Sequence, residues 1–291
     1  MKRNRSIYVL VGLIALLSII VSLVGIFSSG GPGNYEFDAI TGETVTIYGI
    51  GVYAYDSVSV ASQGIASDVI TLLLGVPLLL IALILWHKHS FRGTLLLTGT
   101  LGYFLYTYTS YVFLWMYNPF FILYVILMSS SLFAFIMMMM SMDYVNIKDY
   151  FSPKLSIKLF ASYQYLIGTF IFILWMGKII PTIFEGETPV GLEHYTTLVI
   201  QGMDLGIIVP VAFLSATLLI KKKPMGYVIT SVVLVKGFTM LLAISGMMIN
   251  MMIHEVTMEL IPTIMFFSLA LISIFIFIKL LRQTNPNLQS T

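Results

Sequence analysis

The sequence predicts an all-α integral membrane protein with a bundle of about eight transmembrane helices. Of its 291 residues, 58% are hydrophobic and only 10% are charged, whereas soluble domains carry about 25% charged residues. Apolar runs of about 20 residues, the length that a helix needs to cross a bilayer, also recur along the chain. The segments that reach this length are residues 6–27, 68–87, 93–117, 119–142, 159–180, 196–220, 225–249 and 259–281.

The basic residues predict how these spans are oriented. With the N-terminus inside the cell, 13 of the 15 Lys and Arg residues lie in or next to cytoplasmic segments, namely the two tails and the turns at 88–92, 143–158 and 221–224. Such an excess of positive charge marks the cytoplasmic side. We therefore expect a multi-pass protein of the cell membrane, surrounded by the lipid bilayer, with both termini in the cytoplasm. The apolar run of the first span is about 21 residues, longer than the core of a signal peptide, so we expect it to remain as an anchor.

The segment between the first two spans predicts a small extracytoplasmic cap. It starts at the flexible stretch SSGGPGN, and later the alternating TVTIY follows the turn-forming ITGET, a pattern typical of a short β-hairpin. The expected organisation is a first transmembrane helix at 1–28, the cap at 29–67, a seven-helix transmembrane bundle at 68–282 and a cytoplasmic tail at 283–291.

Two parts of the chain suggest an internal repeat. Residues 75–99 and 208–232 both contain V-P near the start, a lysine eleven residues after that proline and a glycine sixteen residues after it. The offset is 133 residues, and five of the 25 aligned positions are identical. One interpretation is a four-plus-four parallel duplication, as in many transporters. The alternative is a chance resemblance between apolar hairpins.

Two opposite charges are predicted to lie inside the membrane. At a rise of 1.5 Å per residue, Asp204 lies roughly 12 Å inside the outer boundary, and Lys236 in the next span lies near the midplane. An ionisable group at such a depth costs on the order of 2.5–3.5 kcal/mol and indicates a functional site by default. Because pairing offsets this cost, we expect the two side chains to be partners, in direct contact or through a bridging water or polar residue.

Other polar residues are expected to share this seam. Gln201 lies on the same face of its helix as Asp204. We expect a polar stripe on the third span to form one wall of the seam, and an acid stands at the outer lip of the second span. The wall residues are Tyr103, Tyr106 and Ser110, and the acid is Asp68. Tyr108, Tyr111 and the three tryptophans are instead expected at the membrane interfaces, where aromatic residues gather.

The seam supports two hypotheses of function. The first is a transporter-like protein, or one that binds a small-molecule solute within the membrane, with Asp204 able to exchange a proton. The second is a non-transporting membrane subunit or sensor in which the Asp204–Lys236 pair only fixes the helix register, since a buried pair adds little net stability. A continuous hydrated cavity that reaches Asp204 favours the first hypothesis, and a dry direct contact favours the second.

A further alternative is Cu(I) binding at the outer face. Thioethers and imidazole suit Cu(I), and several such residues stand at the outer end of the last hairpin: Met247, Met248, Met251, Met252, His254 and Met258. Methionine is also an ordinary apolar filler, and the chain contains 18 of them. We therefore predict no metal site and no cofactor.

Several other classes of function are not supported. The chain has no cysteine and a net charge of +2, so neither a thiolate site nor nucleic-acid binding is expected. It contains no phosphate-binding loop, nucleophile elbow or dinucleotide fingerprint. Only one acid, Asp204, lies well within a span, so no paired-carboxylate mechanism and no catalytic residue are predicted.

Three stretches of the chain resemble a family of prokaryotic multi-pass membrane proteins that has no assigned activity. These stretches are SDVITLLLGVPLLL, YNPFFILYVILM and QGMDLGIIVP with the KKKPMGYVI and VLVKG that follow it. The likeness covers about half of the chain and consists of apolar patterns of low specificity. It implies a membrane protein and no activity or site residue.

Overall fold

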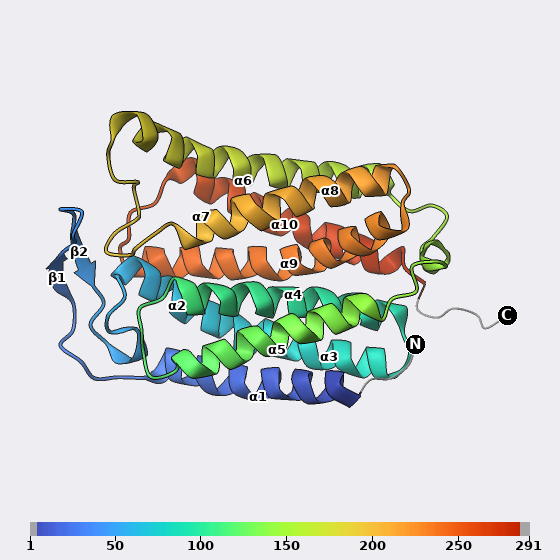
Figure 1. The fold of residues 1–291 in the computed structure, drawn as a ribbon, viewed down its shortest axis with the longest axis horizontal. Helices are drawn as coiled ribbons and strands as arrows, with labels where there is room; N and C mark the ends of the chain where they lie inside the picture. Colours follow the sequence, from blue (N-terminus) through green and yellow to red (C-terminus); the bar gives the residue numbers. More distant parts are fainter. Residues whose placement is uncertain (1–4, 286–291) are drawn as a thin grey trace.

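The computed structural model describes residues 5–285, which form long, roughly parallel helices and a small hairpin at one end (Figure 1). Seven helices in this part of the chain are long and apolar enough to cross a membrane. Their faces away from the bundle expose large apolar side chains such as Val9, Ile122 and Leu271, as lipid contact requires. The seven are α1 (Arg5–Phe27), α2 and α3 (Val58–His87 with the π-helical turn between them), α5 (Phe121–Met140), α6 (Ile157–Glu185), α7 and α8 (Val199–Ile220, likewise), α9 (Pro224–Ile253) and α10 (Leu260–Arg282).

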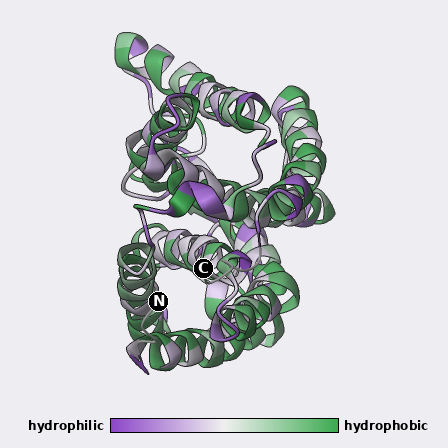
Figure 2. Cartoon of the chain, turned by 90° about the vertical axis from the view of Figure 1, so that its right-hand side faces the viewer, coloured by the Kyte–Doolittle hydropathy of each residue, from purple (hydrophilic) through white to green (hydrophobic). Residues whose placement is uncertain are grey.

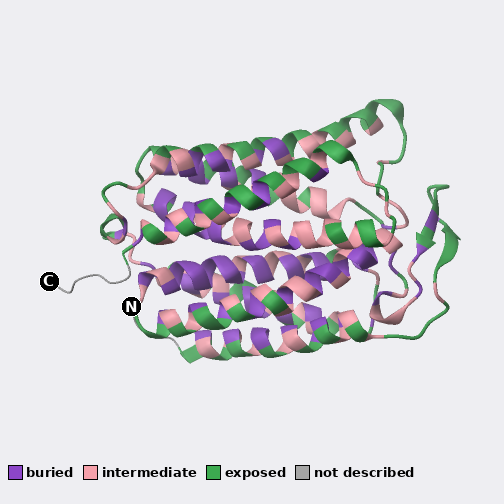
Figure 3. Cartoon of the chain, turned by 180° about the vertical axis from the view of Figure 1, so that it is seen from behind, coloured by how far each residue is buried: buried purple, intermediate pink, exposed green. Residues whose placement is uncertain are grey.

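The helix α4 (Phe91–Phe113) has a similar length but is not among these seven. It carries more Thr, Tyr and Gly than its neighbours, and most of its residues are buried in the middle of the bundle (Figure 3). It approaches α9 very closely at Gly99, where an added Cβ would lie 2.4 Å from the Cβ of Val235. The least hydrophobic long helix therefore occupies the interior of the bundle.

The predicted hairpin forms the cap at one end of the bundle. Strands β1 (Tyr35–Asp38) and β2 (Thr44–Ile47) pair antiparallel, with Tyr35 opposite Ile47. A short 3-10 turn, η1 (Gly51–Tyr53), leads from the hairpin back to the helices. The helix α2 begins at Val58 rather than at residue 68, because the Ser57 side chain accepts a hydrogen bond from the Val60 amide and caps the helix there. Residues 58–67, assigned to the cap from the sequence, are therefore helical.

The helices are arranged in two groups of similar shape. Figure 2, which looks along the helices, shows the two groups side by side. One group contains α1 to α5 and the other contains α6 to α10, and α9 joins them through its contacts with α2 and α4. The ends of α1 and α10 nearest the chain termini lie opposite the hairpin (Figure 1).

The two groups contain hairpins of the same construction, offset by 133 residues. The π-helical turn Thr71–Gly75 (η2) precedes α3 (Val76–His87), and the turn Asp204–Ile208 (η4) precedes α8 (Val209–Ile220). In each hairpin the second residue after the turn is proline, whose ring would clash with the carbonyl of an ordinary helical turn. The wide turn removes this conflict, and π-helical turns are frequent at functional sites.

The turn that joins the two helices of each hairpin, between α3 and α4 and between α8 and α9, is also equivalent. His89 and Lys222, which are 133 residues apart, both have a positive φ, of 59° and 49°. The next amides, of Ser90 and Lys223, donate to the carbonyls of Leu85 and Leu218. Each following helix then carries a glycine pressed against the backbone of the preceding one. These glycines are Gly93 and Gly226, where an added Cβ would lie 2.4 Å from backbone atoms.

Candidate functional site

Asp204 is the first residue of the second π-helical turn, and both of its carboxylate oxygens accept a hydrogen bond from another helix. The Tyr106 hydroxyl of α4 donates to Oδ1 at 2.8 Å. The Trp175 indole nitrogen of α6 donates to Oδ2 at 2.9 Å. The side chain is half-buried. Asp204 is thus held between the two groups of helices by two neutral donors.

Lys236 of α9 approaches Asp204 through Tyr106 rather than directly. Its Nζ atom lies 4.0 Å from the centre of the Tyr106 ring, within the range of a cation–π interaction. Within residues 5–285, Asp204 and Lys236 form no ion pair. A bridging polar residue, one of the two arrangements expected from the sequence, therefore joins the charges. We call Asp204, Tyr106, Trp175 and Lys236 the Asp204 site.

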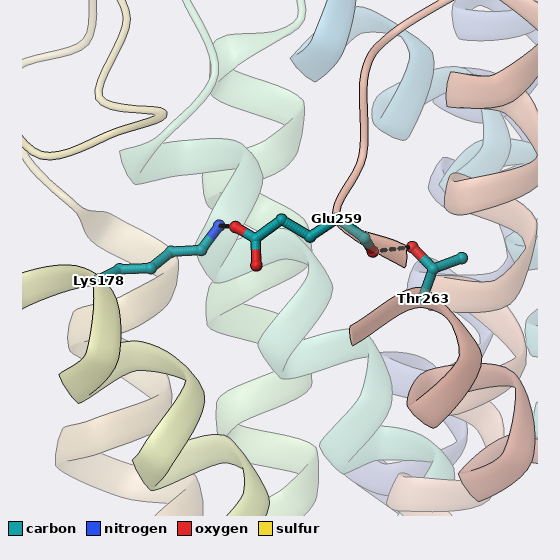
Figure 4. A network of polar contacts seen from close by, with 3 residues as sticks. All are labelled: Lys178, Glu259 and Thr263. Carbon is teal, nitrogen blue, oxygen red and sulfur yellow. Dashed lines mark hydrogen bonds and ion pairs between the residues drawn. The ribbon is translucent and has the colours of Figure 1, made fainter. Parts of the chain in front are cut away.

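The ion pair that this part of the chain does contain lies at the cap end of the bundle. Lys178 Nζ is 3.4 Å from Glu259 Oε1, which joins α6 to the start of α10 (Figure 4). The Thr263 hydroxyl donates to the Glu259 carbonyl at 2.7 Å. The Glu259 side chain is 62% exposed, so this pair contributes little to stability.

The ammonium group of Lys236 is incompletely satisfied. It has three N–H donors, yet it donates no hydrogen bond to any side chain or carbonyl among the described residues. The side chain is half-buried. A half-buried cation whose N–H groups have no acceptor among the described residues can take an additional hydrogen-bond acceptor.

The remaining residues of the predicted seam are dispersed. Gln201 lies half-buried one turn before Asp204 and makes no side-chain hydrogen bond within residues 5–285. Tyr103 is fully buried and bonds to Thr71 at 2.9 Å, at the first π-helical turn. The Ser110 hydroxyl donates to the Thr107 carbonyl of its own helix. Of the residues predicted to form one seam, the structure brings together Asp204, Tyr106 and Lys236.

Asp68 belongs to a separate network in the first group of helices. Its side chain is buried beneath the cap, where the Tyr53 hydroxyl donates to Oδ2 at 2.6 Å. The Tyr111 hydroxyl donates to Oδ1 at 3.2 Å. The acid placed at an outer lip by the sequence is therefore covered, because the segment before α2 folds back over it.

Sequence reasoning missed Trp175 as a member of the site and misplaced other aromatic residues. Trp175 was expected at an interface, but it follows Gly168 by seven residues and so lies on the same face of α6. Gly168 packs against Phe213 of α8. This spacing was the available signal. Tyr108 and Tyr111 were likewise expected in an interfacial belt, yet they are 1% and 2% exposed.

Two other features of α7 and α8 lie away from the Asp204 site. Gly202 and Gly206 are exposed, and an added Cβ would meet nothing within 4 Å, so no described helix packs against them. Ser215 of α8 donates a hydrogen bond to Gln164 of α6. Gln164 in turn donates to Thr230 at 3.1 Å, which makes a separate buried network deeper in the second group.

The cap is tied to both groups of helices by a buried carboxylate outside the membrane-spanning segments. Asp56 Oδ1 accepts hydrogen bonds from the Met116 amide at 2.9 Å and the Tyr195 hydroxyl at 3.0 Å. Burial raises the pKa of the Asp56 carboxyl to about 7, the two hydrogen bonds oppose this shift and the nearby Glu193 reinforces it. Burial also raises the pKa of Glu193 and lowers that of His194 beside it. This end of the protein is therefore sensitive to pH.

The methionine-rich end of α9 does not assemble a carboxylate or imidazole metal cluster. Among the described residues no three His, Cys, Asp or Glu side chains gather around a point that could hold a metal ion. His254 bonds through Nδ1 to the Asn250 carbonyl at 2.9 Å and packs edge-on against Tyr48. This imidazole is thus engaged with the end of its own helix and with the cap.

A hollow of about 460 Å³ lies at the end of the bundle opposite the cap. It is lined by the connection between α5 and α6, the turn before α9 and the residues after α10, including Lys148, Lys222, Tyr227 and Asn285. The Asp204 site contributes nothing to its lining.

Comparison of the chain with family models, with curated proteins and with solved structures found no match. The interpretation of the Asp204 site therefore depends on its geometry and chemistry alone.

Proposed function

We propose that this chain is a transporter-like membrane protein that binds a small solute or a proton at the Asp204 site. In this proposal α4 is an eighth span, which neighbouring helices shield from lipid. Both termini lie in the cytoplasm, as the distribution of Lys and Arg indicates. A buried polar helix that supplies a ligand-binding face is typical of proteins with a solute pathway, where ionisable groups face the interior of the bundle.

The observation that carries the proposal is the incomplete pairing of Lys236. A pair that only fixed the helix register would be in direct contact, because Coulomb attraction must offset the desolvation of both groups. Here the hydrogen-bond donors to the Asp204 carboxylate are neutral, Lys236 acts on that carboxylate electrostatically without direct contact, and the N–H groups of Lys236 have no acceptor among the described residues. The arrangement suits a solute with a carboxylate, phosphate or carbonyl oxygen at Lys236, or a proton exchanged at Asp204.

The relation between the two groups of helices supports the same proposal. We infer a four-plus-four parallel duplication, because the two hairpins have equal lengths, turns and glycine contacts at one constant offset. At that offset, Thr71 and Tyr103 correspond to Asp204 and Lys236. The first pair forms a neutral hydrogen bond at 2.9 Å. One half would then be structural at this position, and the other half would carry the functional charges.

Thermal unfolding of the detergent-purified protein tests this function. Acetate, glycine and inorganic phosphate serve as probes, with the protein tested alone, as Lys236→Met and as the control Lys178→Met. We expect at least one probe to raise the Tm of the parent and of the control but not of Lys236→Met. If a proton is the ligand, the fluorescence of Trp175 titrates with pH, and Asp204→Asn abolishes this titration. Absence of both responses would contradict the proposal.

A second candidate is a non-transporting subunit or sensor. It is favoured by the hydrogen bonds that already occupy both oxygens of Asp204, and by the position of the 460 Å³ hollow away from the site. The exposed Phe37 and Ile40 of the cap would then contact a partner protein. In this case none of the probes changes the Tm, and the fluorescence of Trp175 does not titrate.

A further inference from the structure

A second buried carboxylate in the first group of helices has no cationic partner. Asp68 is 2% exposed and forms no ion pair within residues 5–285. Both of its oxygens accept hydrogen bonds from phenols, those of Tyr53 and Tyr111. The titratable groups close enough to interact with it are tyrosines from the cap, α4 and α5: Tyr53, Tyr103, Tyr108, Tyr111 and Tyr124. All of these are neutral as phenols.

Unpartnered hydroxyls from α1 and α4 lie in the same region. The side-chain oxygens of Ser18, Ser22 and Tyr108 are buried and form no hydrogen bond of good geometry within the described residues, although Ser18 lies close enough to Tyr108 to interact with it. Ser22 lies close enough to Asp68 to stabilise its charge. Buried polar atoms without a partner are rare in native proteins, so the Ser22 oxygen can serve as a ligand beside Asp68.

The backbone leaves room for the carboxylate on the α1 side. A Cβ added at Gly25 would lie 1.8 Å from Asp68 Oδ2 and 3.1 Å from the Tyr53 hydroxyl. On the α2 side, the Gly64 carbonyl lies 3.1 Å from the Tyr111 hydroxyl and shares its single proton with Asp68 Oδ1. One carboxylate, three hydroxyls and one carbonyl thus lie together between α1, α2, α4 and the cap.

We propose that Asp68, Ser22, Tyr53, Tyr111 and the Gly64 carbonyl bind a single monovalent cation, either a proton or Na⁺. An isolated carboxylate in apolar surroundings is strongly destabilised, so it takes up a positive charge. One carboxylate balances one positive charge, which favours a monovalent over a divalent ion. The atoms that would bind the cation are all oxygens, which suit hard cations rather than transition metals.

This site is independent of the Asp204 site. Asp68 lies ten residues into α2, about 15 Å below its start, and level with the end of α1 through Gly25. Tyr53 covers it from the cap. The two aspartates share no hydrogen-bond partner, although α4 contributes a tyrosine to each. The cation site would therefore persist in an Asp204→Asn variant.

Two measurements on the full-length protein in detergent test the proposal. The first compares the Tm in NaCl with that in choline chloride at equal ionic strength. The second records the infrared carbonyl band of protonated carboxyl groups as the pH changes. If Na⁺ is the ligand, NaCl raises the Tm of the parent and of the exposed control Asp149→Asn, but not of Asp68→Asn. If a proton is the ligand, the parent shows a carboxyl band that Asp68→Asn lacks.

A second variant keeps the carboxylate and so tests the site even if Asp68→Asn misfolds. Ser22→Ala removes one hydroxyl, and we expect it to weaken the sodium effect or to shift the carboxyl band. A parent with no sodium-dependent Tm and no carboxyl band that responds to Ser22→Ala or Asp68→Asn would overturn the proposal. Asp204→Asn leaves the sodium effect and the part of the carboxyl band that Asp68→Asn removes unchanged, which separates this result from the test of the Asp204 site.

Discussion

The Nζ atom of Lys236 lies 4.0 Å above the centre of the Tyr106 ring, and the hydroxyl of that ring donates to Asp204. Tyr106 of the buried helix α4 therefore contacts both charged residues. The phenol is oriented by Asp204, and its electron-rich face stabilises the ammonium group.

This relationship predicts that the two contacts of Tyr106 can be separated. Tyr106→Phe retains the ring beneath Lys236 and removes the donor to Asp204, so we expect a loss of about 1.5–3 kcal/mol, as for a hydrogen bond to a charged group. Tyr106→Leu also removes the cation–π interaction and should be less stable still. Thermal or denaturant unfolding in detergent measures both. Tyr117→Phe is the control because Tyr117 is 74% exposed. Equal stability of Tyr106→Phe and the parent would contradict the assigned hydrogen bond.

The constant offset between the hairpins predicts that two glycines respond alike. An added Cβ would lie 2.4 Å from backbone atoms at both Gly93 and Gly226, so each glycine-to-alanine change should destabilise the protein by about 1–3 kcal/mol through overpacking. Gly202→Ala and Gly206→Ala are matched controls, since both positions are helical and open. We expect these to be neutral or to stabilise by up to about 1 kcal/mol, because alanine favours the helix. Unfolding free energies of the four variants provide the comparison. Unequal responses at Gly93 and Gly226 would argue against equivalent packing.

Asp56 predicts a dependence of stability on pH. Burial raises the pKa of its carboxyl from 3.8 to about 7 in the folded protein. The folded state then holds the proton more tightly than the unfolded state, so this group makes stability fall as the pH rises from about 4 to about 7. Asp56→Asn keeps an acceptor for Tyr195 and Met116 but cannot ionise. We expect it to flatten the Tm profile in this window and to be more stable than the parent above about pH 7, by about 1.4 kcal/mol per unit of pKa shift. An unchanged profile would show that Asp56 does not control it.

Arg92 predicts how the segment after α10 is held. Its guanidinium donates twice to the Thr284 carbonyl, at 2.7 and 2.9 Å, and so joins the start of α4 to the end of the second group. Lysine cannot reproduce this two-pronged contact. We expect Arg92→Lys to increase cleavage by trypsin near Arg282, and limited proteolysis followed by mass spectrometry detects this. Lys88→Arg, at an exposed position of the preceding turn, should leave the cleavage rate unchanged.

Much of the fold could be predicted because apolar periodicity and turn residues act locally. The expected span 225–249 corresponds to α9 (Pro224–Ile253), and the strands of the expected hairpin flank ITGET. The start of α2 was missed because the helix begins at Val58, after the Ser57 cap, and so well before the apolar run 68–87 that predicted the span. The π-helical turns were also missed, although both precede a V-P dipeptide.

The site was only partly predictable, because its partners come from different helices. A charged residue in an apolar run is visible in the sequence, so Asp204 and Lys236 could be found. Which helix faces them is decided by packing. Trp175 and Tyr53 reach the two aspartates from segments distant in the sequence, and no local pattern distinguishes a donor tyrosine from one at the membrane interface.

The most direct test of the central claim is a double-mutant cycle on Asp204 and Lys236. The unfolding free energies of the parent, Asp204→Asn, Lys236→Met and the double variant are measured in detergent. Because Tyr106 contacts both charges but keeps them out of direct contact, the account predicts moderately destabilised single variants and an interaction energy of about 0.5–1 kcal/mol, at the low end for residues in one network. Two strongly destabilised single variants with a double variant as stable as the parent would instead reveal a structural pair and contradict a ligand site at Asp204.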